Sequence, residues 1–222
     1  MPEELRYRAV LFDLDGTLVD SYAALADAVN FARGKFGLGS LPTETIREFV
    51  GEGLERLLCR AFYTDVVPAG ATEAFETRYD AICCEQSRIL DDVEDTLADL
   101  DRLGVSMAVC TNKPTAFSRK ILEFLELAHF FCDIVGPDTA GARKPAAQHV
   151  LRTLEATHCS PDQALFVGDM PLDVTAAHNG GMAAAVVPTG TASSAALKAA
   201  KPEHYLDRLA DLVQIVRNGA SA

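Results

Sequence analysis

Short apolar runs recur along the chain, and helical patterns separate the later ones. Runs with little polar alternation are typical of strands that are buried on both faces of a sheet. Five such runs occupy residues 7–12, 105–110, 131–135, 164–168 and 183–187. Strands that alternate with helices in this way predict a doubly wound parallel sheet, so we expect an α/β fold.

A long helical stretch separates the first two of these strands. Apolar residues recur in it at three- and four-residue steps, the spacing of amphipathic helices, and no strand is evident. We expect residues 18–87 to form an all-helical cap domain with its own small core, inserted into an α/β core domain formed by residues 1–17 and 88–222. Its position directly after the first strand favours a lid over a helical subdomain with only a packing role.

Two aspartates, Asp13 and Asp15, follow the first buried strand. In an open α/β sheet, ligands bind at the carboxyl ends of the strands, and residues two apart point to the same side. Two carboxylates this close repel each other unless a cation lies between them or one keeps its proton. The pair therefore favours metal-assisted attack by a carboxylate with acid/base help from its neighbour. The alternative is a polar strand end with a turn at Asp15 and Gly16.

Polar groups follow two later strands as well. Thr111 and Asn112 lie before a helix, whose unpaired N–H groups suit phosphate oxygens, although either residue could simply cap that helix. Lys144 precedes Pro145, which keeps the lysine extended and off the following helix. Its ammonium could neutralise a phosphate and a nucleophilic carboxylate; a solvated surface lysine is the alternative.

A fourth strand ends in Asp169, and Asp173 follows at the start of a helix. This spacing allows the two carboxylates to share one face, although acids are also favourable at helix N-termini without any ligand. Opposite Asp13 and Asp15 they would form an oxygen-rich site suited to Mg²⁺. No cluster of histidine and cysteine favours zinc instead.

Charge and composition narrow the classes of molecule that the protein can bind. The net charge of −12 argues against a nucleic-acid or anionic-membrane surface but leaves room for a small anionic substrate. No apolar stretch reaches the roughly 18 residues of a membrane span, and residues 1–6 lack the basic-then-apolar order of a signal peptide. The six cysteines show neither zinc spacing nor disulfide density. We expect a cytoplasmic protein, monomeric or homodimeric.

Taken in order, these strand-end motifs resemble the four motifs of the haloacid dehalogenase superfamily. The resemblance covers essentially the whole chain, including the helical cap, and implies a Rossmann-like core. The matching segments are Phe12-Asp13-Leu14-Asp15-Gly16-Thr17-Leu18, Thr111-Asn112, Lys144-Pro145 and Gly168-Asp169-Met170-Pro171-Leu172-Asp173. Any one of them would be weak evidence, whereas four in order are highly specific.

The resemblance implies a role for each motif residue. Asp13 would attack phosphorus and form an aspartyl-phosphate. Asp15 would protonate the leaving alkoxide and then deprotonate the hydrolytic water. The phosphoryl oxygens would be held by Thr111 and Lys144. The implied Mg²⁺ ligands are Asp13, the backbone carbonyl of Asp15, and Asp169, with Asp173 supporting that shell or Lys144.

Resemblances within the superfamily also narrow the reaction. Dehalogenating members lack an acid at the position of Asp15, and phosphonate-cleaving members depart from the Asp-x-Asp pattern, which leaves a phosphatase or a phosphomutase. The segment that holds Gly51, Glu52 and Gly53 resembles the substrate-facing loop of phosphoglycolate phosphatases. We expect these three residues to bind substrate together with Thr111, Asn112 and Lys144. Arg56 could contact a substrate carboxylate, and a solvated arginine is the alternative.

The sequence therefore predicts a magnesium-dependent phosphatase acting on a small phosphomonoester, with 2-phosphoglycolate as the leading candidate. A sugar phosphomutase resembling β-phosphoglucomutase is the alternative, in which Asp15 would help return the phosphoryl group to sugar. A phospho-accepting signalling module is less favoured, because such modules are shorter and lack both the Asp15-Gly16-Thr17 element and a cap.

Overall fold

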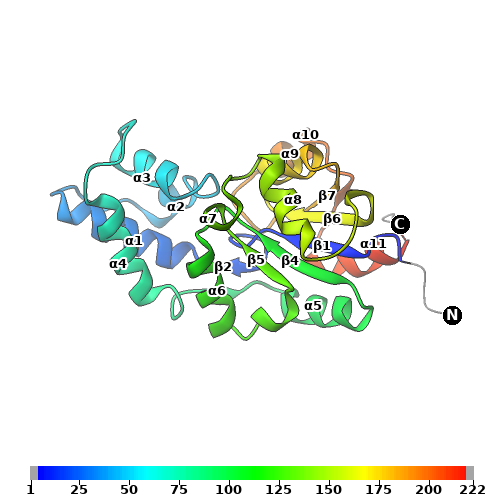
Figure 1. The fold of residues 1–222 in the computed structure, drawn as a ribbon. Helices are drawn as coiled ribbons and strands as arrows, with labels where there is room; N and C mark the ends of the chain where they lie inside the picture. The colour runs from blue at the N-terminus through cyan, green and yellow to red at the C-terminus, as the bar shows by residue number, and fades with distance from the viewer. Residues whose placement is uncertain (1–4, 219–222) are drawn as a thin grey trace.

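A six-stranded parallel sheet forms the centre of the α/β core (Figure 1). The structure is a computed structural model that describes residues 5–218. Along the sheet the strands follow the order β5-β4-β1-β6-β7-β8, and every pair is parallel. The strands are β1 (Ala9–Phe12), β4 (Ser106–Cys110), β5 (Asp133–Val135), β6 (Ala164–Gly168), β7 (Ala183–Val186) and β8 (His204–Tyr205). All five predicted strands are confirmed, and β8 is an addition at the edge.

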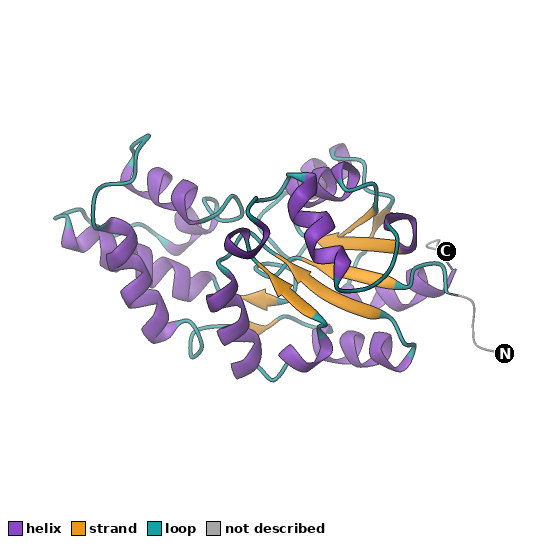
Figure 2. Ribbon diagram, viewed as in Figure 1, coloured by secondary structure: helices purple, strands orange, loops and turns teal. Residues whose placement is uncertain are grey.

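Helices cover both faces of this sheet (Figure 2). The alternation of side chains along β1 shows why: Val10 and Phe12 join one apolar cluster, whereas Ala9 and Leu11 join another on the opposite face. The helices of the core are α5 (Val93–Arg102), α6 (Thr115–Phe124), α7 (Pro137–Ala140), α8 (Ala147–Glu155), α9 (Pro171–Asn179), α10 (Ser194–Ala199) and α11 (Leu212–Asn218). Short 3₁₀ turns span Ala128–Phe130, Pro161–Gln163 and Leu209–Asp211. The doubly wound arrangement is confirmed.

Four helices between β1 and β4 form a lobe beside the sheet, at the left of Figure 1. They are α1 (Tyr22–Lys35), α2 (Thr43–Arg47), α3 (Leu54–Phe62) and α4 (Ala71–Ile82). The predicted apolar stripes supply buried side chains of α1, α3 and α4. The division of the chain into domains at 17/18 and 87/88 stays a prediction.

Two details of the insert differ from the expectation. First, β2 (Val19–Asp20) pairs antiparallel with β3 (Arg88–Ile89) at its base, so the segment 18–87 is not entirely helical. Strands of two residues are too short to produce a recognisable alternation. Second, the lobe has no core of its own, because one buried cluster runs from its helices through Leu14 and Leu18 into the sheet.

No helix within residues 5–218 combines the length and the apolar character that crossing a membrane requires. Most of the segment considered for a signal peptide, residues 1–6, lies outside the described residues.

Candidate active site

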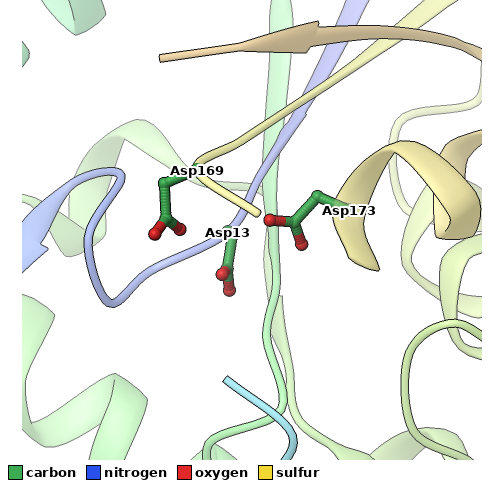
Figure 3. Close-up of side chains that lie close together, drawn as sticks. All are labelled: Asp13, Asp169 and Asp173. Carbon is green, nitrogen blue, oxygen red and sulfur yellow. The ribbon is translucent and has the colours of Figure 1, made fainter. Parts of the chain in front are cut away.

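The carboxyl ends of three neighbouring strands bring the motif residues together. Asp13 directly follows β1 and donates its N–H to the carbonyl of Val167, 2.9 Å away, which continues the ladder with β6. Thr111 follows β4 and Asp169 follows β6, on either side of β1. Because the strands are parallel, these ends lie at one edge of the sheet, as predicted. Asp173 projects toward the same place from the first turn of α9 (Figure 3).

The ammonium of Lys144 joins two of these carboxylates. Its Nζ lies 2.8 Å from Oδ1 of Asp13 and 2.8 Å from Oδ1 of Asp173, and all three side chains are buried. Burial opposes the charge on Lys144, but the two carboxylates outweigh it and raise its pKa above the ordinary value. Burial also raises the pKa of Asp173 to about 6, and Lys144 limits that rise. The lysine is thus held as a cation beside Asp13.

Within residues 5–218, no cation forms an ion pair with Asp169. Its side chain is buried and accepts a hydrogen bond from Oγ1 of Thr17 at 3.3 Å. Burial, together with the charges of Asp173 and Asp13, raises its pKa well above the ordinary range. The backbone at Gly16 and Gly190 packs directly against this carboxylate. A Cβ on Gly16 would lie 2.6 Å from Oδ2 of Asp169, and a Cβ on Gly190 would lie 1.5 Å from it. Glycine at these positions therefore keeps the carboxylate in place, and the sequence had not singled out Gly190.

These acids form a cluster that fits a divalent cation. One carboxylate oxygen from each of Asp13, Asp169 and Asp173 lies within 4.8 Å of the others. When ionised, these three buried carboxylates carry more negative charge than the ammonium of Lys144 can balance. Isolated buried charges are costly, and a hard divalent cation with oxygen ligands would remove this imbalance. Because Asp173 already binds Lys144 and the N–H of Met170, it supports the lysine.

Asp15 faces a second cation, Lys113. The Nζ of Lys113 lies 2.7 Å from Oδ1 of Asp15, 2.7 Å from Oη of Tyr79 and 3.3 Å from Oγ of Ser21. Ser21 also donates its hydroxyl to Asp15 at 2.5 Å. Burial opposes the charge on Lys113, but Asp15 and Tyr79 outweigh it and raise its pKa. Sequence reasoning gave Lys113 no role, because a lysine after a strand carries no sign of its direction.

Asn112 holds backbone groups. Its Oδ1 accepts from the N–H of Lys144 at 2.8 Å, and its Nδ2 donates to the carbonyls of Gly51 and Lys144 at 3.0 and 3.3 Å. The side-chain amide is therefore occupied, which departs from the expectation that it binds substrate. Thr111 is buried at the site, and its Oγ1 accepts from the N–H of Lys113. Neither residue caps helix α6.

A cavity of about 60 Å³ lies between the helical lobe and the sheet edge. Asp13, Asp15, Thr111 and Lys113 line its polar end. Its apolar wall comes mainly from the lobe and includes Leu25, Val50, Leu54, Leu57, Phe75 and Phe117. A group bound to Asp13 would therefore be partly enclosed by the lobe, as a lid requires.

The predicted residues of the lobe separate into two groups. Gly51 and Gly53 line the cavity. Glu52 instead forms an ion pair with Arg60, and Arg56 is exposed and lines a different surface hollow beside Arg60. The expectation that Glu52 and Arg56 reach the substrate is therefore not met in this arrangement. For Arg56 the helical phase of α3 explains the difference, because Leu54 and Leu57 of this helix line the cavity instead.

A nucleophile-type carboxylate at a strand end, a buried lysine beside it and an acid cluster under a helical lobe define a class of hydrolase. The chain belongs to the haloacid dehalogenase-like hydrolase family, whose sequence profile matches residues 10–187. Curated relatives narrow the class further. A phosphoglycolate phosphatase of Mannheimia succiniciproducens is 32% identical over 221 residues, which cover 95% of this chain and 99% of the relative.

A second relative, the phosphoglycolate phosphatase of Aquifex aeolicus, is 33% identical over 211 residues and covers 95% of this chain and 97% of its own length. Among solved structures, a predicted phosphoglycolate phosphatase from Haemophilus somnus superposes with a TM-score of 0.84 at 28% identity, covering 95% of this chain and 98% of that one. The chain is thus an enzyme of the phosphoric monoester hydrolase type.

Proposed function

We propose that this phosphatase hydrolyses a small phosphomonoester with the help of Mg²⁺, through an aspartyl-phosphate on Asp13. The observation that carries the proposal is the contact of Lys144 with Asp13, a carboxylate that lines a partly enclosed cavity. A carboxylate held by a buried ammonium can approach an anionic phosphoryl group, because the ammonium offsets the repulsion between the two anions.

The reaction would proceed in two displacements. In the first, a carboxylate oxygen of Asp13 bonds to phosphorus while the bond between phosphorus and the ester oxygen breaks. Asp15, entering in its protonated form, gives its proton to the leaving oxygen. In the second, Asp15 takes a proton from water, the water oxygen bonds to phosphorus, and the bond from phosphorus to Asp13 breaks. Asp13 is regenerated and inorganic phosphate leaves.

Lys144 and Thr111 would hold the phosphoryl oxygens during both displacements. Lys144 supplies a fixed positive charge, since Asp173 orients it from the far side. Asp13, the backbone carbonyl of Asp15, and Asp169 would hold Mg²⁺, with Asp173 supporting Lys144. When bound, Mg²⁺ supplies electrostatic stabilisation of the charge on the phosphoryl group in transfer.

Two observations favour 2-phosphoglycolate as the substrate. The relatives named above are phosphoglycolate phosphatases, and each aligns with this chain over nearly its whole length. The cavity beside Asp13 is also small, about 60 Å³, and its wall is mostly apolar, so we expect it to favour a small leaving group over the hexose that a sugar phosphomutase would require.

A screen of phosphate release tests this proposal. The protein is incubated with Mg²⁺ and a panel of small phosphomonoesters that includes 2-phosphoglycolate, glycerol phosphates and hexose phosphates. We expect inorganic phosphate from the panel and the highest kcat/KM for 2-phosphoglycolate. Isomerised sugar phosphate without free phosphate would favour the mutase, and stable phosphorylation of Asp13 without turnover would favour a signalling module.

A further inference from the structure

We propose that Lys113 and Tyr79 together form the receptor for a carboxylate on the leaving group, so that the enzyme selects phosphomonoesters of small hydroxy acids. The inference rests on the proposed function and assigns its substrate specificity to two residues. One of them, Lys113, follows β4 in the core; the other, Tyr79, lies on α4 of the lobe. A complete receptor would therefore require both parts of the protein.

Lys113 is the only cation among the described residues that line the cavity. The candidate anion-binding residue expected from sequence, Arg56, lines another hollow. Lys144 is already shared by Asp13 and Asp173. An anionic leaving group in this mostly apolar cavity must find a positive partner, because an unpaired buried carboxylate is costly. Lys113 is in the position to supply it.

The position of Lys113 beside Asp15 determines which part of the substrate the lysine contacts. Asp15 must approach the ester oxygen to within hydrogen-bond distance in order to protonate it. The Nζ of Lys113 lies 2.7 Å from Oδ1 of Asp15. A group on the carbon next to the ester oxygen therefore falls beside the ammonium. In a phosphorylated 2-hydroxy acid, that group is the carboxylate.

Tyr79 adds a second donor at the same place. Its hydroxyl accepts from Lys113 at 2.7 Å, and among the described residues it has no acceptor for its own proton. Burial raises the pKa of Tyr79 to about 12, so the hydroxyl keeps that proton at neutral pH. Phe75 stacks on the Tyr79 ring and Phe117 packs edge-on against it, which fixes the direction of the hydroxyl. Two fixed donors side by side match the two oxygens of a carboxylate.

A purely structural role is the competing explanation, since Lys113 already pairs with Asp15. That role would affect all phosphomonoesters equally, whereas a carboxylate receptor acts only on substrates that carry the charge. The test compares kcat/KM for 2-phosphoglycolate with that for its carboxamide, which has the same number of heavy atoms and no charge on the leaving group. We expect the wild-type protein to prefer the acid by about 10- to 100-fold, the range of charge-assisted hydrogen bonds.

Two variants locate the preference. Lys113→Met should reduce it to within about threefold, and Tyr79→Phe, which removes one hydroxyl from a retained ring, should reduce it by about three- to tenfold. Lys120→Met is the matched control, because Lys120 is likewise a core lysine that contacts α4, pairing with Asp80 on the exposed side. It should keep the wild-type preference. Thermal unfolding checks that each variant is folded. If Lys113→Met does not fold, the acid-to-amide ratio of kcat/KM in the wild-type protein and in Tyr79→Phe tests the receptor.

The outcomes separate this inference from the function it rests on. A wild-type preference below threefold, or an unchanged preference in folded Lys113→Met and Tyr79→Phe, would overturn the receptor while leaving the phosphatase proposal intact. Absence of phosphate release from both esters would overturn the proposed function, and the receptor with it.

Discussion

Asn112 of the core donates its side-chain N–H to the carbonyl of Gly51 in the helical lobe, across 3.0 Å and 61 positions of sequence. The same amide also accepts a hydrogen bond from the N–H of Lys144 and donates one to its carbonyl. One side chain therefore fixes the loop that carries Lys144 and the loop of the lobe that faces the cavity. This makes Asn112 a positioning residue.

Replacing Asn112 by alanine should lower kcat/KM by about 10- to 100-fold, because the loop of Lys144 loses its anchor and small displacements of reacting groups are costly. The buried N–H of Lys144 would lose its partner, which costs about 1–3 kcal/mol of stability. Asn179→Ala is the control, since Asn179 binds the carbonyl of Pro145 on the exposed side of the same loop. Kinetics and thermal unfolding measure both effects; equal losses in the two variants would contradict a special role for Asn112.

The nucleophile assignment makes a sharper prediction. Asp13→Asn should lower kcat by about 10³-fold or more, because an amide oxygen is a poor nucleophile toward phosphorus. Its stability should stay within about 1 kcal/mol of wild type, since Lys144 keeps Asp173 as a partner and the shape is unchanged. Phosphate release measures the loss of kcat, and thermal unfolding measures the stability. Near-normal turnover in Asp13→Asn would refute the mechanism, and the exposed Asp162→Asn serves as the control.

Much of this architecture could be predicted from the sequence because its signals are local. Short unbroken apolar runs such as β1, separated by helical patterns, favour buried parallel strands, and polar residues that follow three such runs then meet where the strands end. Short elements gave no such signal. The pair β2–β3 has two residues per strand, and α2 has five residues with only Ile46 buried.

The site residues that escaped prediction depend on tertiary contacts. Lys113 reads as one more polar residue after a strand, and Tyr79 reads as part of the apolar stripe of α4; only packing of the lobe on the core brings their polar atoms to 2.7 Å. Arg56 was misplaced for the reverse reason. Proximity to Gly53 in sequence says nothing about the direction that a helix gives the side chain.

Magnesium should stabilise the protein through Asp169. At a concentration of 100 times its dissociation constant, a ligand of the native state adds about 2.7 kcal/mol, or about 5–10 °C in a chain of this size. Asp169→Asn should lose this shift in Tm. Without metal the same variant should melt above wild type, because it removes a buried carboxylate that pairs with no cation in the described part of the chain. Thermal unfolding with Mg²⁺ and with EDTA measures both.

Asp162→Asn should keep the full magnesium shift, since this acid is exposed and distant from the cluster. An unchanged shift in Asp169→Asn would exclude Asp169 as a ligand. Asp169→Asn should thus have a lower Tm than wild type with Mg²⁺ and a higher Tm with EDTA. General damage to the fold would lower its Tm under both conditions.

Arg56→Ala should leave KM for 2-phosphoglycolate within about twofold of wild type, because the side chain is exposed and lines a hollow apart from the cavity. Steady-state kinetics at saturating Mg²⁺ give the value. A rise of tenfold or more would show that the lobe turns Arg56 toward the substrate in another arrangement, and would restore the role expected from sequence.

We expect His149 to make the stability of the protein depend on pH, separately from the buried acids of the candidate site. Its Nε2 lies 3.1 Å from the carbonyl oxygen of Val135, and among the described residues its buried Nδ1 has no hydrogen-bond partner. Burial, aided by the charge of Lys144, lowers the pKa of His149 below its ordinary value of about 6.5.

Below pH 6.5 the unfolded chain therefore binds a proton at His149 that the native state refuses, so stability falls as the pH falls toward the native pKa. The slope is at most about 1.4 kcal/mol per pH unit. His149→Gln, which cannot titrate, should flatten this part of the profile, so that its Tm relative to wild type rises between pH 7 and pH 5. Asp173 has a raised pKa and the opposite sign, but it is present in both proteins and cancels in the comparison. The exposed His129→Gln is the matched control. A parallel pair of profiles for His149→Gln and wild type would show that His149 is not the group responsible.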